Sequence, residues 1–277
     1  MPSGGDRPLE GRTLPLTVCP ARTTLRQLSA VLLTMGAEVR GCNRREGSRL
    51  KEGVPVAETK RILCLANSRK LSGRCVAGIE IVDDDALAGW IRPVSARSTH
   101  EVSELEREYR DGSDPKVLDI IDIPLLSHQP DGFQTENWLL DPDYYWVRHG
   151  GADWAFLEPL LTEARPLWLN GFSSSNGEND RVPEENAATL RDSLRLIRVR
   201  EATLRVMDGY SRREVRAGFT HAGDAYWLKV TDPVIERRAK QKKNGDYRLG
   251  ESAFTVSLGE TFQGYAYKLV AAIIRRP

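Results

Sequence analysis

From residue 60 onward, short apolar runs alternate with turn residues, a pattern typical of small β-barrels and sandwiches. A charged stretch at 101–110, followed by the turn Asp111-Gly112, predicts a short surface helix. The apolar runs of this half predict four strands, at 61–66, 74–82, 89–95 and 117–125. A helix before the fourth strand is the element order of an OB-like barrel.

After residue 190, the second half again shows short apolar runs that alternate with turn residues. Asp208-Gly209 and Asn244-Gly245 predict tight turns between its strands. Residues 131–185 carry many tryptophans and tyrosines but few strand signals, which indicates a helical or irregular connector. The strands of the second half are expected at 194–207, 214–220, 224–231, 253–258 and 265–274.

We therefore expect a mainly β (α+β) fold with two tandem OB-like small β-barrels and an aromatic-rich connector. The first module is placed at 59–135, the connector at 136–190 and the second module at 191–277. Residues 1–58 are rich in Arg, Gly and Pro, and we interpret them as a poorly ordered extension. Two alternatives stay open: a small helical DNA-binding unit at 23–50, or a natural start near Val54 or Val56.

Composition limits the classes of function. Lys and Arg number 40 against 39 Asp and Glu, so the net charge of +1 gives no global attraction to nucleic acid or membranes. The four cysteines are isolated, which predicts neither a metal site nor a disulfide framework. No apolar run approaches the roughly 20 residues that span a bilayer. We expect a cytoplasmic protein without a metal or cofactor.

The first stretch that could carry chemistry is the turn after the first strand. It contains Asn67, Ser68, Arg69, Lys70 and Arg74. Such a turn can direct amides, hydroxyls and guanidinium groups at one phosphate, although it lacks the glycines and the Gly-Lys-Ser/Thr ending of a P-loop. The alternative is a solvated hairpin turn.

Two strands repeat an aromatic-x-cation pattern before a proline. Period-two alternation places Trp90 and Arg92 on one face of the first, and Trp227, Lys229 and Thr231 on one face of the second. A base can stack on the indole while the cation meets a phosphate. The alternative is that Trp90 covers a core, but the repetition favours two related modules.

An arginine series at 195–216 adds local basicity, which nearby carboxylates could neutralise. Signals for catalysis are few. Asp119 and Asp122 are three residues apart on a predicted strand and so point to opposite faces. His128, with Glu136 nearby, could act as a general acid and base, but a structural role is the alternative.

Several ordered segments resemble the bacterial dual OB domain family. They are residues 60–79, 89–95 and 118–123 in the first half, and 230–233, 256–260 and 267–272, with Lys268, near the end. The resemblance covers about 60–274. It implies two tandem OB folds, recognition of nucleic acids or nucleotides, and frequent occurrence among mobile or anti-phage defence genes.

The leading hypothesis is a binding protein, not an enzyme, that holds single-stranded DNA or RNA. Its expected contact residues are Asn67, Ser68, Arg69, Lys70, Arg74, Trp90, Arg92, Trp227, Lys229, Thr231 and Lys268. The competing hypothesis is a sensor or processing enzyme for a small nucleotide, with the 67–74 turn as phosphate site and Asp119, Asp122 or His128 for chemistry. A third is an adaptor whose aromatic connector binds a protein partner.

Overall fold

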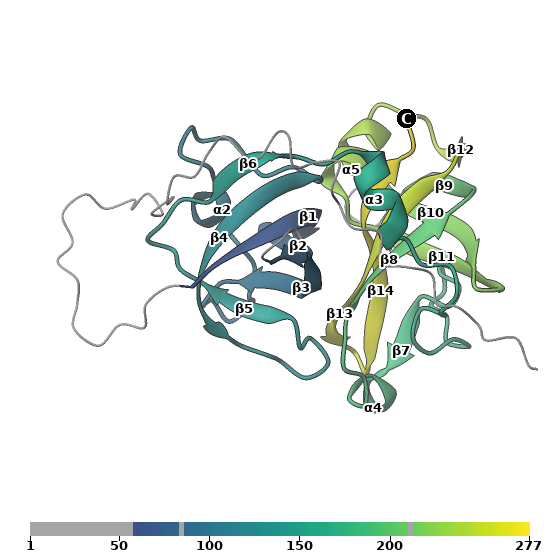
Figure 1. Ribbon diagram of the computed structural model, residues 1–277. Coiled ribbons are helices and arrows are strands. Elements are labelled where there is room, and N and C mark those ends of the chain that lie inside the picture. Colours follow the sequence, from purple (N-terminus) through teal and green to yellow (C-terminus); the bar gives the residue numbers. More distant parts are fainter. Residues whose placement is uncertain (1–57, 83–85, 210–212) are drawn as a thin grey trace, which may run out of the picture. The chain divides into compact units, whose positions relative to one another are not determined.

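The computed structural model describes residues 58–82, 86–209 and 213–277. Nearly all of the extension expected at 1–58 therefore lies outside the described residues. The described part is mainly β and contains a six-stranded and an eight-stranded sheet, which confirms the expected fold class (Figure 1).

The first sheet closes on itself as an OB barrel. Its strands pair in the order β1-β2-β3-β5-β4, and β4 pairs again with β1. The β3–β5 pairing is parallel and the others are antiparallel, while β6 extends the sheet beside β4. The elements are β1 (Glu58–Lys70), β2 (Gly73–Ile81), β3 (Leu87–Val94), α2 (Glu104–Arg107), β4 (Asp119–His128), β5 (Asn137–Leu140) and β6 (Val147–Gly151).

The second sheet repeats this circuit. The stretch expected as one strand at 194–207 is interrupted at Arg200 and Glu201, and its halves β8 and β9 pair with different neighbours. They close the order β9-β10-β11-β14-β13-β8, with β11–β14 parallel like β3–β5, and β12 lies outside β9. The elements are β8 (Leu194–Val199), β9 (Ala202–Asp208), β10 (Arg213–His221), β11 (Asp224–Val230), α5 (Pro233–Ala239), β12 (Gly245–Leu249), β13 (Ser252–Phe262) and β14 (Tyr265–Arg275).

Short elements lie inside the range expected as a connector, 136–190. Strands β5 and β6 belong to the first sheet, and β7 (Arg181–Pro183) pairs with β14 of the second. The range also holds α3 (Trp154–Leu157), η2 (Glu158–Leu160) and α4 (Glu184–Ala187). Of its aromatic side chains, Trp146 lies in the first core and Trp154 between the barrels, whereas Phe172 is exposed.

An apolar layer joins the two barrels. The outward side chains of β1, Leu63 and Leu65, pack with Trp154 of α3 and with Leu196 and Ile274 of the second barrel. Ala66 and Ala77 pack with Leu194 and Ala271, and the half-buried Trp90 contacts both groups. The outer face of β1–β3 is thus covered by β8, β13, β14 and α3.

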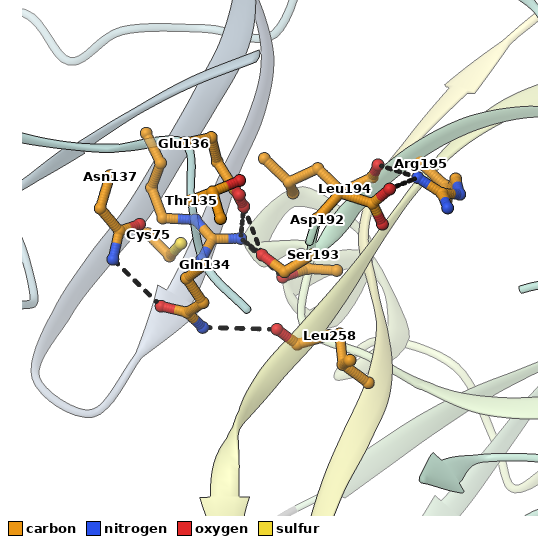
Figure 2. A network of polar contacts seen from close by, with 12 residues as sticks. Cys75, Gln134, Thr135, Glu136, Asn137, Asp192, Ser193, Leu194, Arg195 and Leu258 are labelled. Carbon is orange, nitrogen blue, oxygen red and sulfur yellow. Dashed lines mark hydrogen bonds and ion pairs between the residues drawn. The ribbon is translucent and has the colours of Figure 1, made fainter. Parts of the chain in front are cut away.

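A buried polar network crosses the same boundary (Figure 2). Arg92 is 3% exposed and pairs with Glu136 at 3.0 Å, and its Nη2 donates to Ser193 Oγ of the second barrel at 2.8 Å. Ser193 donates in turn to Glu136, and Gln134 Nε2 donates to the carbonyl of Leu258 at 3.4 Å. Because every strong charge here has a partner, the network stabilises one docking geometry.

One cation lies inside the second barrel. Lys268 of β14 is 1% exposed, and its Nζ donates to the carbonyl of Leu169 at 2.7 Å and to Asn170 Oδ1 at 2.8 Å. Burial lowers the pKa of this amine to about 7, although the carboxylates of Asp180 and Asp224 oppose the shift.

We predict that Arg92→Ala lowers the free energy of unfolding by about 3–5 kcal/mol, because the substitution leaves Glu136 buried without its cation. The control is Arg97→Ala, since Arg97 forms an ion pair with Glu106 on the surface, with its side chain 44% exposed. This pair should contribute about 1 kcal/mol or less. Urea denaturation of the full chain measures both, and equal small losses would contradict the prediction.

We also predict that Lys268 makes stability depend on pH above neutrality. Below pH 7 both states hold the proton, and the folded state bears the cost of burying it. Between pH 7 and the ordinary lysine pKa of about 10.4, only the unfolded state stays protonated, so stability rises with pH by roughly 1 kcal/mol per unit. Over this window the unfolding free energy of the wild type should rise relative to that of Lys268→Met. A difference that stays constant with pH would contradict the assignment.

Candidate nucleic-acid interface

The residues of the 67–74 turn, which the sequence predicts as a phosphate site, are engaged in contacts within the protein. Asn67 and Ser68 are buried, and Asn67 Nδ2 donates to the carbonyl of Pro115 at 2.7 Å. The Arg69 guanidinium donates to both carboxylate oxygens of Glu236 on α5, at 2.8 and 2.9 Å. The turn instead holds the second barrel.

The two remaining cations of the turn are also engaged. Lys70 Nζ lies 2.5 Å from Glu260 Oε1 on β13. Arg74 is half-buried, and its Nη1 donates to the neighbouring carbonyl of Gly73 at 3.2 Å. Burial and the nearby Arg107 lower the pKa of Arg74. The five turn residues therefore do not converge on an open site.

The strand face that carries Trp90 and Arg92 packs against the second barrel. The predicted alternation holds, because both side chains leave the first barrel on the same side. That side is covered by the second barrel, where Trp90 contacts the apolar layer and Arg92 enters the polar network. This packing leaves Trp90 half-buried and Arg92 buried.

Trp227 lies in a different setting. Its neighbours Tyr226 and Leu228 point into the second core, so the indole and Lys229 lie on the outer face of β11. Gly218 of β10 is directly opposite Trp227. A Cβ at position 218 would lie 2.5 Å from Trp227 Cζ2, so the indole rests against the backbone of β10 where only glycine leaves room.

The register of four strands places further side chains around the indole. Directly opposite residues share a face of a sheet. One row across β12, β9, β10 and β11 contains Arg248, Thr203, Gly218 and Trp227. The next row contains Asp246, Arg205, Arg216 and Lys229.

A groove of about 1010 Å³ lies over the first of these rows. Its lining includes Trp227, Thr203 and Arg248, with Thr220 and Arg200 toward one end. Arg248 is exposed, and its side chain has no hydrogen bond or ion pair with any described residue. The groove therefore offers an aromatic surface, hydroxyl groups and an available guanidinium.

Most other cations of this face are already paired. Lys229 Nζ lies 2.7 Å from Glu214 Oε2, and Arg216 Nε lies 2.8 Å from the other oxygen. Burial opposes ionisation of Glu214, but these two cations lower its pKa. Arg205 forms an ion pair with Asp246, and the hydrogen bonds from Arg205 lower the pKa of the Asp246 carboxyl. The expected local basicity is thus largely neutralised.

Two further expected contact residues, Thr231 and Lys268, point away from the outer face. Thr231 is buried, and its hydroxyl donates to the carbonyl of Val270 at 3.4 Å. Lys268 points into the second barrel, as described above. Neither is available to a ligand on the outer face, so Trp227 and Lys229 alone of the expected residues lie there.

The residues considered for chemistry do not assemble into a catalytic site. Asp119 accepts from Tyr109 and Arg148, whereas Asp122 pairs with Arg61 and His149. The ring of His128 contacts the carbonyl of Thr135 at 2.6 Å. Among the described residues, no three His, Cys, Asp or Glu side chains are grouped to hold a metal ion. Within the same part of the chain, no helix has the length and apolarity to cross a membrane.

Sequence reasoning missed Gly218 and Arg248, and it considered Arg205 only as one member of the arginine series at 195–216. A glycine inside a strand often marks the close approach of another group, so Gly218 was a usable signal. Arg205 and Arg248 gain meaning only through the pairing of β9 and β12, which the pattern of β12 did not reveal.

The comparisons with known proteins agree with the topology. No curated protein and no solved structure matches the chain. A family described as the dual OB-containing domain matches residues 60–273, which include both closed circuits of strands. The chain belongs to the family of dual OB-containing domains.

Proposed function

We propose that the protein binds single-stranded DNA or RNA on the outer face of β9, β10 and β11, around Trp227. OB-fold domains generally bind nucleic acids, and they do so on the face of their second and third strands. In the second barrel these strands are β10 and β11, because β8 and β9 together form the first. This is the face on which the groove lies.

The observation that carries the proposal is the difference in what lies against the two equivalent faces. In the first barrel, the face of β2 and β3 is occupied by the second barrel through Trp90 and its apolar neighbours. In the second barrel, Trp227 is half-buried like Trp90, but it borders a groove. We therefore expect one binding face per chain.

A small nucleotide in the same groove is the second candidate. The volume of about 1010 Å³ and the pairing of Arg205, Arg216 and Lys229 favour a short ligand. The two candidates differ in how affinity depends on length and on salt. Affinity for a strand rises with oligonucleotide length, whereas a nucleotide site is saturated by a mononucleotide, and its affinity depends less on salt. Titration with DNA and RNA oligomers and mononucleotides at two salt concentrations separates them.

The cellular setting is also a proposal. The family resemblance suggests a bacterial cytoplasmic protein that acts in anti-phage defence or on mobile elements. Expression in a phage-sensitive host, with plaque counts for wild type and Trp227→Ala, tests it. Equal plaque counts for wild type and an empty vector would contradict a defence role.

We predict that Trp227→Ala weakens single-strand binding by about 1–3 kcal/mol, the usual contribution of one stacked base, because the stacking surface of this face is built on the indole. The matched control is Trp138→Ala, because Trp138 also has a cation over its ring, Lys60 at 4.4 Å, but lies on the first barrel. The control should bind as wild type does. Fluorescence anisotropy measures affinity, and unchanged binding by Trp227→Ala would contradict the proposed face.

We predict that Arg248→Ala weakens binding nearly equally for all sequences and lowers the salt slope by about one phosphate contact. The reason is that Arg248 is the exposed cation of the groove without a partner among the described residues. Anisotropy titrations at several salt concentrations give the slope, and an unchanged slope would remove Arg248 from the phosphate path.

A further inference from the structure

Two groups lie against the indole of Trp227. One face rests against the backbone of β10 at Gly218. The guanidinium carbon of Arg205 lies over the ring, 4.3 Å from its centroid. Where the guanidinium covers the ring, a base that approaches from solvent meets Arg205 before it meets the indole.

Asp246 holds the guanidinium of Arg205 in a defined plane. Arg205 Nε and Nη2 donate to the two carboxylate oxygens of Asp246, each at 2.8 Å. Two parallel hydrogen bonds of this kind fix orientation as well as position. The Arg205 side chain is 46% exposed, so the plane remains open to solvent.

We propose that Arg205, and not Trp227, is the residue on which a nucleobase stacks; this rests on the proposed function of the same face. The layers would be the Gly218 backbone, Trp227, Arg205 and the base. A guanidinium is planar and weakly hydrated, and bases stack on it. Because Asp246 neutralises its charge, Arg205 recognises the base rather than the phosphate.

The alternative, in which Arg205 swings away and the base stacks on Trp227, requires more to be broken. Both hydrogen bonds to Asp246 and the cation-π contact with Trp227 would be lost. Stacking on the outer plane of Arg205 preserves all three contacts. The structure therefore favours a preformed platform over a displaced side chain.

The test is Arg205→Lys in the full chain, because lysine keeps the charge but has no plane. The probes are a single-stranded oligothymidylate or oligouridylate of about 12 nucleotides, a length within the range that OB folds cover. An abasic oligomer of the same length supplies phosphates without bases. The control is Arg97→Lys, since Arg97 has a similar exposure of 44% in its ion pair with Glu106 on the first barrel.

We expect Arg205→Lys to bind the base-bearing probe about fivefold or more weakly, the lower range of one lost stack. Its affinity for the abasic probe should equal that of wild type, and Arg97→Lys should match wild type on both probes. An equal loss on both probes would identify Arg205 as a phosphate contact and overturn the platform. So would wild-type affinity in Arg205→Lys while Trp227→Ala is impaired. If wild type binds neither base-bearing probe, the proposed function itself fails.

Discussion

The burial of the outer face of β1–β3 against the second barrel is the constraint on which the rest of the structure depends. Leu63, Leu65 and Trp90 would otherwise leave an apolar surface in water, and their burial is the main favourable contribution to docking. Docking in turn encloses Arg92, and an enclosed guanidinium needs the partners that Glu136 and Ser193 provide. The apolar layer fixes the contact, and the polar network selects one register for it.

This constraint gives the two copies of one fold different roles. Both contain an aromatic-x-cation strand, and both cations end beside a glutamate: Arg92 with Glu136, and Lys229 with Glu214. The first pair is enclosed between barrels, whereas the second stays on an open face. The 67–74 turn of the first barrel also contacts the second barrel, since Arg69 forms an ion pair with Glu236 and Lys70 with Glu260. The first barrel thereby acts as a support for the second.

The sequence pattern predicts the OB order but not the division of roles. The strands of both halves and the helix before the fourth strand follow from apolar runs and turns, although that helix is a single turn, α2. The sequence pattern does not predict strands β5, β6 and β12, because they are only four or five residues long. Their positions are mostly half-buried or exposed, which weakens the alternation of apolar and polar residues. Helix α5 has a readable signal in Asp232, which caps it, and Pro233 at its first turn.

A usable signal for the covered face was present as well. Residues 62–66 are apolar without alternation and buried on both faces, as expected of a strand packed between two layers. In contrast, β11 alternates between buried and half-buried positions after its first residues, as expected of a strand with one open face. The continuous run distinguishes a docked strand from one with an open face, even where the two barrels carry the same aromatic-x-cation motif.

What sequence cannot supply is the contact between Arg205 and Trp227. These residues lie 22 positions apart, on strands that are separated by β10, and they meet only because Gly218 leaves space for the indole to lie across that strand. The same register places Asp246 beside Arg205. A face whose cations are held by carboxylates has little charge left for phosphates, so its affinity must come from planar surfaces. This physical consequence connects the near-neutral composition of the chain to recognition of bases.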